Sequence, residues 1–229
     1  MASTLLFDPS DTLLDLHALD PYFQRLFGRS GVRREWWAEL QRLALVDALT
    51  DTHREFRQLA EAALEMVAER HRIRLRKSDT EEILGALSRL PPYPDALESL
   101  ARLRDAGFRL VGMSNSDVGL TEAQLRQAGL REYFDAVLSA TDTGHPKPAA
   151  EPYREAAERL GVPPRELRVV AGDYADLRGA LHSGCSAALL ERPGAMVDPD
   201  LEMPDIVARD LVALAERLVE VELGQTFPG

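Results

Sequence analysis

Thr4-Leu5-Leu6-Phe7-Asp8-Pro9-Ser10-Asp11-Thr12 is the stretch that decides the fold, because a short and mostly apolar run ends abruptly in a carboxylate. The run predicts a buried strand, and the Asp8-Pro9 step after it predicts a tight turn at the carboxyl end of that strand. Ligands of open α/β sheets bind beyond the carboxyl ends of the strands. We therefore interpret Asp8 as a functional carboxylate rather than a packing residue.

Three later segments repeat this arrangement, in which an apolar run or a rigid loop delivers polar side chains to a strand end. The polar residues concerned are Ser114 and Asn115, then Lys147 between two prolines, then Asp173 and Asp176. The carboxyl ends of parallel strands share one edge of a sheet, so these groups are expected to face a common crevice. Four such segments in this order suggest an aspartate nucleophile with supporting groups.

The chain between the first strand and the second changes character. Residues 16–90 contain no clear strand, and helical patterns are expected at 18–27, 34–49, 52–71 and 79–89. Pro91-Pro92-Tyr93-Pro94 then forms a stiff connection. We predict two domains: a core made of residues 1–15 and 91–229, and an inserted helical cap made of residues 16–90.

From residue 95 onwards, expected strands and helices alternate. The strands are predicted at 108–113, 133–139, 167–171, 186–190 and 205–208, with helices between them and a last helix at 210–221. Alternation of this kind indicates a mainly parallel sheet covered on both faces. The predicted fold class is α/β, a Rossmann-like doubly wound parallel sheet with an inserted helical cap. The tail at 224–229 is expected to be frayed.

Composition excludes several classes of function. The chain has 229 residues and a net charge of −11, which argues against a general nucleic-acid binder. One cysteine cannot form an internal disulfide, and no apolar stretch has the length of a membrane span, so we expect a cytoplasmic protein without a membrane or nucleic-acid partner. The expected partner is a small-molecule substrate, and a homodimer is an open alternative.

The chemistry of the pattern centres on Asp8. A carboxylate becomes a better nucleophile when it loses hydration but keeps a cation that holds it ionised, and Lys147 is the candidate cation. Thr12 could bond back to the carboxylate or cap the next helix, while Ser114 and Asn115 offer donors for an anionic substrate. Taken singly, each of these residues could equally be a turn, a cap or a surface residue.

Two carboxylates remain for a second role. Asp173 or Asp176 could bind a hard cation, hold Lys147 in place, or orient a water molecule. A magnesium site, if there is one, would use the carboxylates of Asp8 and Asp173 with the main-chain carbonyl of Ser10. The cofactor is therefore predicted to be either none or Mg²⁺.

The pattern resembles the haloacid dehalogenase superfamily. Asp8 with Thr12 is similar to its first motif, Ser114 to its second, Lys147 to its third, and Gly172-Asp173 with Asp176 to its fourth. The resemblance covers nearly the whole chain. It implies a Rossmann-like core, a mobile cap and a covalent aspartyl intermediate, with Asp8, Thr12, Lys147, Asp173 and Asp176 as catalytic residues.

Within the superfamily, the chain looks closest to the L-2-haloacid dehalogenase group. Superfamily phosphatases carry an acid two residues after the nucleophile, where this chain has Ser10, and a leaving halide needs no proton. The group also resembles this chain in Tyr153, which lies six residues after Lys147. The resemblance implies that substrate is bound by Ser10, Ser114, Asn115 and Tyr153.

Some positions depart from that group. Its Tyr-Gly pair is replaced by Ser10-Asp11, and its Ser and Asn by Gly172 and Asp173. The cap arginine that receives the halide falls near Ala38. Candidates to take over its role are Arg33, Arg34 and Arg42.

Three functions follow from this mixture. The first is a hydrolase of the 2-haloacid dehalogenase kind, acting on a small anionic substrate through an ester on Asp8. The second is a Mg²⁺-dependent phosphatase or phosphotransferase, in which Asp11 would turn inward to replace the missing acid. The third is a non-hydrolytic lyase, cyclase or binding scaffold on the same fold.

Overall fold

The computed structural model describes residues 4–193, 195–196, 198–200 and 202–224. Within that part of the chain, contacts divide the protein into two compact units, one made of Met1–Asp15 with Pro92–Gly229 and the other of Leu16–Pro91. The expectation for the tail concerns residues that, apart from Gly224, lie outside the described part. Among the described residues, no helix combines the length and the apolar character needed to cross a bilayer.

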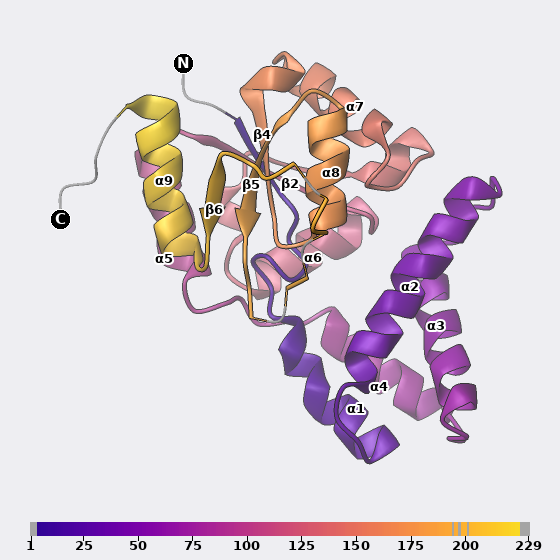
Figure 1. Ribbon diagram of the computed structural model, residues 1–229. Helices are drawn as coiled ribbons and strands as arrows, with labels where there is room; N and C mark the ends of the chain where they lie inside the picture. Colours follow the sequence, from indigo (N-terminus) through magenta and orange to yellow (C-terminus); the bar gives the residue numbers. More distant parts are fainter. Residues whose placement is uncertain (1–3, 194, 197, 201, 225–229) are drawn as a thin grey trace. The chain divides into compact units, whose positions relative to one another are not determined.

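The first unit is built on a parallel sheet (Figure 1), which among the described residues has six strands in the order β3-β2-β1-β4-β5-β6. The strands are β1 (Thr4–Phe7), β2 (Arg109–Ser114), β3 (Ala136–Ser139), β4 (Leu167–Ala171), β5 (Ser186–Leu190) and β6 (Ile206–Ala208). The register pairs Phe7 with Gly112 on one side and with Val170 on the other. The predicted α/β class with a doubly wound parallel sheet is confirmed.

The central strands are continuous apolar runs because both faces of the sheet are covered. Every residue of β1 and β4 is buried, as expected for strands sandwiched between helix layers. On one face, Leu6, Val111 and Val169 pack with residues of two helices, α7 (Ala150–Leu160) and α8 (Tyr174–His182).

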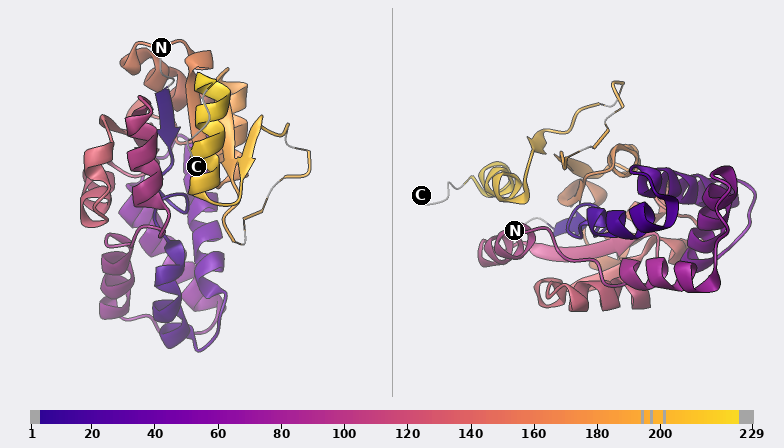
Figure 2. Two further views of the ribbon diagram at one scale, coloured as in Figure 1. Left: turned by 90° about the vertical axis from the view of Figure 1, so that its left-hand side faces the viewer. Right: turned by 90° about the horizontal axis from the view of Figure 1, so that it is seen from below.

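The remaining helices of this unit follow the alternation expected from the sequence. They are α5 (Ala96–Asp105), α6 (Val118–Gln127) and α9 (Leu211–Leu223), with short 3₁₀ helices at Arg131–Tyr133, Ala140–Thr143 and Pro164–Glu166. α5 and α9 pack against each other (Figures 1 and 2), and α6 contacts β3. The strand expected from residue 133 begins only at Ala136, because Arg131–Tyr133 forms a 3₁₀ turn first.

The second unit is all helical in its described residues. It contains a 3₁₀ helix at Leu16–Leu19, then α1 (Asp20–Phe27), α2 (Val32–Leu49), α3 (Phe56–Arg70) and α4 (Lys77–Leu87). α3 starts later than the pattern at 52–71 predicts, because a capping box fixes its first turn: the Glu55 amide donates to the Gln58 side chain at 2.9 Å. The core of this unit includes Trp36, which is fully buried and donates its indole N–H to the Ala60 carbonyl at 3.0 Å.

Strand order determines where a ligand can enter the first unit. β1 has β2 on one side and β4 on the other, and the chain winds outward from β1 in opposite directions. Such a reversal is the switch point at which open α/β sheets hold their ligands, beyond the carboxyl ends of the strands. Asp8 follows β1 and Asp173 follows β4, so both lie at this point.

Candidate active site

Asp8 lies at the start of a closed turn that follows β1. Its amide donates to the Val170 carbonyl at 3.2 Å, which continues the pairing of β1 with β4 by one residue. The chain then reverses, because the Pro9 carbonyl accepts hydrogen bonds from the amides of Leu13 and Leu14 at 3.1 and 3.0 Å. We call residues 8–14 the nucleophile turn. The turn leaves the Asp8 side chain 15 % exposed, which is open enough for contact with a small substrate.

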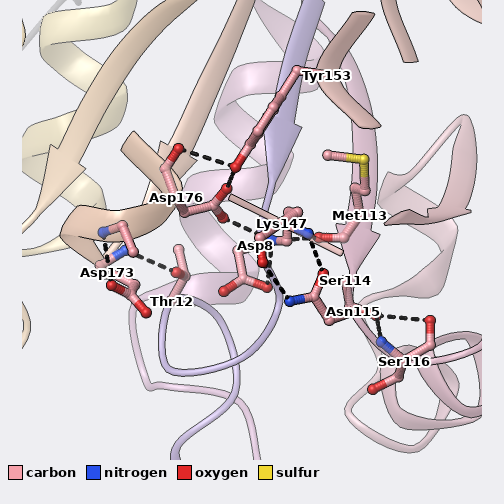
Figure 3. A network of polar contacts seen from close by, with 12 residues as sticks. Asp8, Thr12, Met113, Ser114, Asn115, Ser116, Lys147, Tyr153, Asp173 and Asp176 are labelled. Atoms are coloured by element: carbon pink, nitrogen blue, oxygen red, sulfur yellow. Dashed lines mark hydrogen bonds and ion pairs between the residues drawn. The ribbon is translucent and has the colours of Figure 1, made fainter. Parts of the chain in front are cut away.

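Lys147 contacts groups from the ends of β1 and β2 and from the first turn of α8, the helix that follows β4 (Figure 3). Its Nζ lies 3.2 Å from Asp8 Oδ1 and 2.7 Å from Asp176 Oδ2, and it donates to the Met113 carbonyl at 3.0 Å. The Lys147 side chain is only 7 % exposed. A buried ammonium between two carboxylates is a fixed positive charge directly beside the candidate nucleophile.

Asn115 holds the main chain of Lys147. The Lys147 amide donates to Asn115 Oδ1 at 2.7 Å, and Asn115 Nδ2 donates to the Lys147 carbonyl at 3.0 Å. This pair of bonds imitates strand pairing and fixes the rigid loop beside β2. The sequence offered Asn115 as a donor for the substrate, whereas in this geometry its amide serves the position of Lys147.

Asp176 anchors the far side of the lysine. It lies in the first turn of α8, and its carboxylate is 5 % exposed. Oδ2 faces Lys147, while Oδ1 accepts a short hydrogen bond from the Tyr153 hydroxyl, which also lies 3.1 Å from the Asp176 carbonyl. Both carboxylate oxygens are therefore engaged by other side chains.

The electrostatics of the group follow from burial and from an excess of carboxylates. Burial, assisted by the charges of Asp176 and Asp173 and opposed by Lys147, raises the pKa of Asp8 to about 7. Burial alone would lower the pKa of Lys147, but the neighbouring carboxylates Asp176 and Asp8 raise it above its usual value. The lysine thus stays charged, and Asp8 changes charge near neutral pH.

Tyr153 is fully buried and stays protonated. Burial and the carboxylate of Asp176 raise its pKa well above the usual value. Its hydroxyl therefore acts as a donor to Asp176. The sequence placed Tyr153 among the substrate-binding residues, and here its recorded polar contacts are with Asp176.

Thr12 and Asp173 join the nucleophile turn to the end of β4. Thr12 is fully buried, and its Oγ1 accepts a hydrogen bond from the Gly172 amide at 3.1 Å. Asp173 is the N-cap of α8, where its Oδ1 accepts from the Ala175 amide at 2.9 Å. Gly172 has little room for a side chain, because a Cβ there would lie 3.2 Å from the Leu190 carbonyl.

Ser114 and Ser10 complete the predicted residues. The Ser114 hydroxyl is buried, accepts from the Ser116 amide at 3.1 Å and lies 2.6 Å from the Thr121 hydroxyl. It therefore helps to shape the turn after β2. Ser10 lies in the nucleophile turn, where it bridges to Leu14. The roles assigned to these residues stay predictions.

Asp11 is held away from the acid role that a phosphatase would require of it. The Tyr93 hydroxyl donates to Asp11 Oδ1 at 2.9 Å, and Asp11 adopts a left-handed backbone with φ of 54°. Its carboxylate is thus engaged at the side of the turn that faces Tyr93.

Four residues of the first unit contribute to the surroundings of the site without having been singled out from the sequence. They are Tyr93, Asp95, Gly179 and Arg192. Gly179 of α8 is a place of close approach, since a Cβ there would meet the Pro148 carbonyl and would lie 2.8 Å from a ring carbon of Tyr153. A glycine inside an otherwise helical segment was the available signal for it. The others carry no local pattern.

The carboxylates of the site do not form a metal-binding set. Within the described part of the chain, no group of three or more His, Cys, Asp or Glu side chains is arranged to hold an ion. Of the predicted ligands, Asp8 already faces Lys147, and Asp173 Oδ1 caps α8. These engaged carboxylates do not fit a dedicated magnesium site.

Comparison with known proteins gives a consistent answer. The family model for haloacid dehalogenase-like hydrolases matches residues 2–184. The chain is 30 % identical over 194 residues to (S)-2-haloacid dehalogenase 4A of Burkholderia cepacia, which covers 82 % of this chain and 83 % of the relative. It is 26 % identical over 227 residues to the (S)-2-haloacid dehalogenase of Pseudomonas sp. strain YL, covering 98 % and 97 %.

Solved structures agree in fold. The L-2-haloacid dehalogenase of Xanthobacter autotrophicus superposes with a TM-score of 0.87 at 27 % identity, covering 96 % of this chain and 99 % of that one. The same enzyme with chloropropionic acid covalently bound gives a TM-score of 0.85 at 26 % identity, covering 96 % and 99 %. The resemblance inferred from the motifs is confirmed, and the chain belongs to the haloacid dehalogenase-like hydrolases.

Proposed function

We propose that this hydrolase displaces halide from a small 2-haloacid by nucleophilic attack of Asp8. The observation that carries the proposal is the placement of a half-buried Asp8 carboxylate 3.2 Å from the ammonium of Lys147, at the switch point of the sheet. It is supported by the likeness over nearly the whole chain to a dehalogenase that carries chloropropionic acid as a covalent adduct.

In the first step, an oxygen of Asp8 forms a bond to C2 of the substrate, and the carbon–halogen bond breaks. The halide leaves with the bonding electron pair and needs no proton, so Ser10 can stand where a phosphatase has its general acid. Lys147 opposes the effect of burial on Asp8, so that the carboxylate can ionise near neutral pH, and it balances charge as an anionic substrate approaches. The product of this step is an ester of Asp8.

In the second step, water attacks the ester carbonyl of Asp8, and the acyl carbon–oxygen bond breaks. One proton of the water passes to the departing oxygen, so that the 2-hydroxyacid is released, and the other is lost to solvent as the carboxylate of Asp8 returns. The sequence left Asp173 and Asp176 as alternatives for orienting this water. We assign the role to Asp173, because it follows β4 at the switch point and is half-buried there, whereas Asp176 is buried in the first turn of α8 and holds Lys147 and Tyr153.

Residues 16–90 are proposed to act as a mobile cap that excludes water during the first step. Two of the three candidate arginines are committed within this unit: Arg33 is buried and donates to Asp20 at 2.7 Å, and Arg42 pairs with Glu39. Arg34 is exposed. On this ground Arg34 is the first candidate to receive the halide.

The proposal includes a metal-free reaction in the cytoplasm.

A specific observation keeps phosphoryl transfer as the second candidate. Over 105 residues, 45 % of this chain, the protein is 34 % identical to a glyceraldehyde 3-phosphate phosphatase of Methanopyrus kandleri. Against it stands Asp11, whose carboxylate accepts from Tyr93 rather than serving the site as an acid.

One set of assays separates these functions. Chloride release from (S)- and (R)-2-chloropropionate is measured in EDTA, and p-nitrophenyl phosphate hydrolysis is measured with Mg²⁺, each with wild type and Asp8→Asn. The proposal expects metal-independent chloride release that Asp8→Asn abolishes. Phosphate release with Mg²⁺ and no chloride release would transfer the assignment to phosphoryl transfer. Silence in both assays would favour a non-hydrolytic role.

A further inference from the structure

A buried arginine outside the predicted site contacts the nucleophile turn directly. Arg192 follows β5, is 7 % exposed, and donates to the Thr12 carbonyl from Nη2 at 2.8 Å and from Nε at 3.2 Å. Thr12 is the residue whose hydroxyl accepts from Gly172. Two contacts at Thr12 thus hold the turn. The end of β4 binds the Thr12 side chain, and Arg192 binds the Thr12 carbonyl.

Arg192 is itself fixed by a carboxylate from a distant element. Asp95, which precedes α5, accepts from Nη1 at 2.6 Å and from Nη2 at 2.9 Å, and it also accepts from the Leu211 amide at 2.8 Å. This two-point pairing sets the plane of the guanidinium, which a lysine could not reproduce. Burial alone would raise the pKa of Asp95, but the hydrogen bonds from Arg192 and Leu211 hold that pKa below its usual value.

The guanidinium of Arg192 also covers the ring of Tyr93, and Tyr93 makes its own hydrogen bonds to the nucleophile turn. The Arg192 guanidinium carbon lies 3.9 Å from the centre of the Tyr93 ring. Tyr93 donates from its amide to the Leu13 carbonyl at 2.8 Å and from its hydroxyl to Asp11 at 2.9 Å. Arg192 and Tyr93 together therefore contact three consecutive residues of the nucleophile turn.

We infer that Arg192 is a positioning residue: with Tyr93 and Asp95 it clamps the nucleophile turn and so sets where Asp8 points. This inference rests on the proposed function for its kinetic consequence. The turn is short, and Asp8 shares it with the clamped residues, so loss of the clamp moves the attacking oxygen. A misplacement of about 1 Å costs on the order of 100-fold in rate.

A second buried arginine provides a matched control. Arg168 is 5 % exposed, pairs with both oxygens of Asp205 at 2.5 and 3.0 Å and with Glu222 at 2.6 Å, and donates to the Ala187 carbonyl at 2.7 Å. It has the same kind of partners as Arg192, yet it lies near the beginning of β4, at the opposite end of that strand from Gly172. Arg168→Met removes a buried guanidinium and its ion pairs with Asp205 and Glu222 without touching the turn.

The experiment compares Arg192→Met, Arg192→Lys and Arg168→Met by urea unfolding, by kcat and KM for chloride release, and by the pH dependence of kcat. We expect Arg192→Met to lower kcat about 30- to 100-fold with KM within about threefold of wild type. On the acid side of the pH profile of kcat, the midpoint should not move in this variant. The charges that act on the pKa of Asp8 belong to Lys147, Asp176 and Asp173, which the substitution leaves in place. Arg192→Lys should recover only part of kcat.

Arg168→Met should lose stability but keep kcat within about threefold. The inference is overturned if Arg192→Met keeps kcat within threefold, or if the two arginine variants lower kcat equally. Should Arg192→Met fail to fold, Tyr93→Phe removes a single hydroxyl. A kcat reduced about three- to tenfold in that variant supports the clamp, and an unchanged kcat overturns it.

Amide hydrogen exchange tests the clamp independently of the reaction. The amides of Asp11, Leu13 and Leu14 donate within the nucleophile turn. They should exchange at least tenfold faster in Arg192→Met than in Arg168→Met. If the wild type releases no halide, the proposed function fails, while this exchange result still supports or overturns the clamp.

Discussion

Replacing the nucleophile by its amide is expected to stabilise the protein at neutral and alkaline pH. The pKa of Asp8 is raised from an ordinary value of 3.8 to about 7, first because the carboxyl is buried. Between these two values the native protein binds a proton that the unfolded chain has lost. Stability conferred by the neutral form of Asp8 is therefore present at low pH and is lost as the pH rises towards 7.

The size of the effect follows from that window. Each pH unit in which only the native state holds the proton costs at most about 1.4 kcal/mol, and the window from 3.8 to about 7 gives about 4 kcal/mol. The amide that Asp8→Asn introduces carries no charge at any pH, so the variant escapes this loss. Allowing for relaxation around Lys147, we expect the variant to be about 2–4 kcal/mol more stable at pH 8, a large share of a typical folding free energy.

The assay is urea unfolding of wild type and Asp8→Asn at pH 5, 6, 7 and 8, with chloride release as the activity check. The difference in unfolding free energy should grow with pH and level off above about 7, while activity is absent. Asp105→Asn, on the exposed end of α5, controls for a generic change from acid to amide. A difference that shrinks as the pH rises would show that Lys147 outweighs burial, and it would refute the reasoning.

Four further outcomes are expected. The kcat/KM of wild type should fall about tenfold per pH unit below a midpoint near 7, because only ionised Asp8 attacks, and a flat profile down to pH 5 would contradict this. Lys147→Ala should lower chloride release more than about 1000-fold and cost roughly 3–5 kcal/mol of stability, since two carboxylates lose their buried partner; wild-type turnover would rule out its role. Asp173→Asn should shift the acid limb of the pH profile to lower pH, because the charge of Asp173 raises the pKa of Asp8, and it should let an Asp8 ester accumulate, detectable by intact mass. No ester would accumulate if Asp173 only capped α8. Gly179→Ala should lower kcat more than about tenfold, because the new methyl group displaces Tyr153 and the loop of Lys147. The control is Gly85→Ala in α4, which should leave kcat unchanged because the new methyl group meets only a flexible arginine side chain at 3.4 Å.

The sheet was predictable because its pattern is local. Buried strands must be apolar on both sides, so β1 and β4 stand out as short runs that end in polar groups. Element ends were less accurate where side chains decide them. α3 starts at Phe56 because Glu55 and Gln58 form a capping box, a signal that the helical period alone does not contain.

The candidate site was predictable in its members but not in their pairing. Residue type and position at strand ends brought Asp8, Lys147 and Asp176 together, and the structure places both carboxylates within 3.2 Å of the lysine ammonium. The partner of Asn115 was not foreseeable. An amide at a strand end is equally suited to a ligand and to a neighbouring main chain, and only the path of the loop at Lys147 selects the main chain.

Asp11 shows most clearly why the rest could not be predicted. From the sequence it was a spare carboxylate near the nucleophile and hence a candidate acid. Its actual environment depends on a left-handed backbone and on Tyr93, 82 residues away along the chain. The ring of Tyr93 is in turn covered by Arg192, which reaches Thr12 from a position 180 residues further along. No local pattern encodes such contacts, since each residue alone is ordinary for a turn or a loop. They arise only when the sheet brings β1 and the end of β5 to the same edge, and there they determine whether a carboxylate acts on substrate or supports the turn that carries the nucleophile.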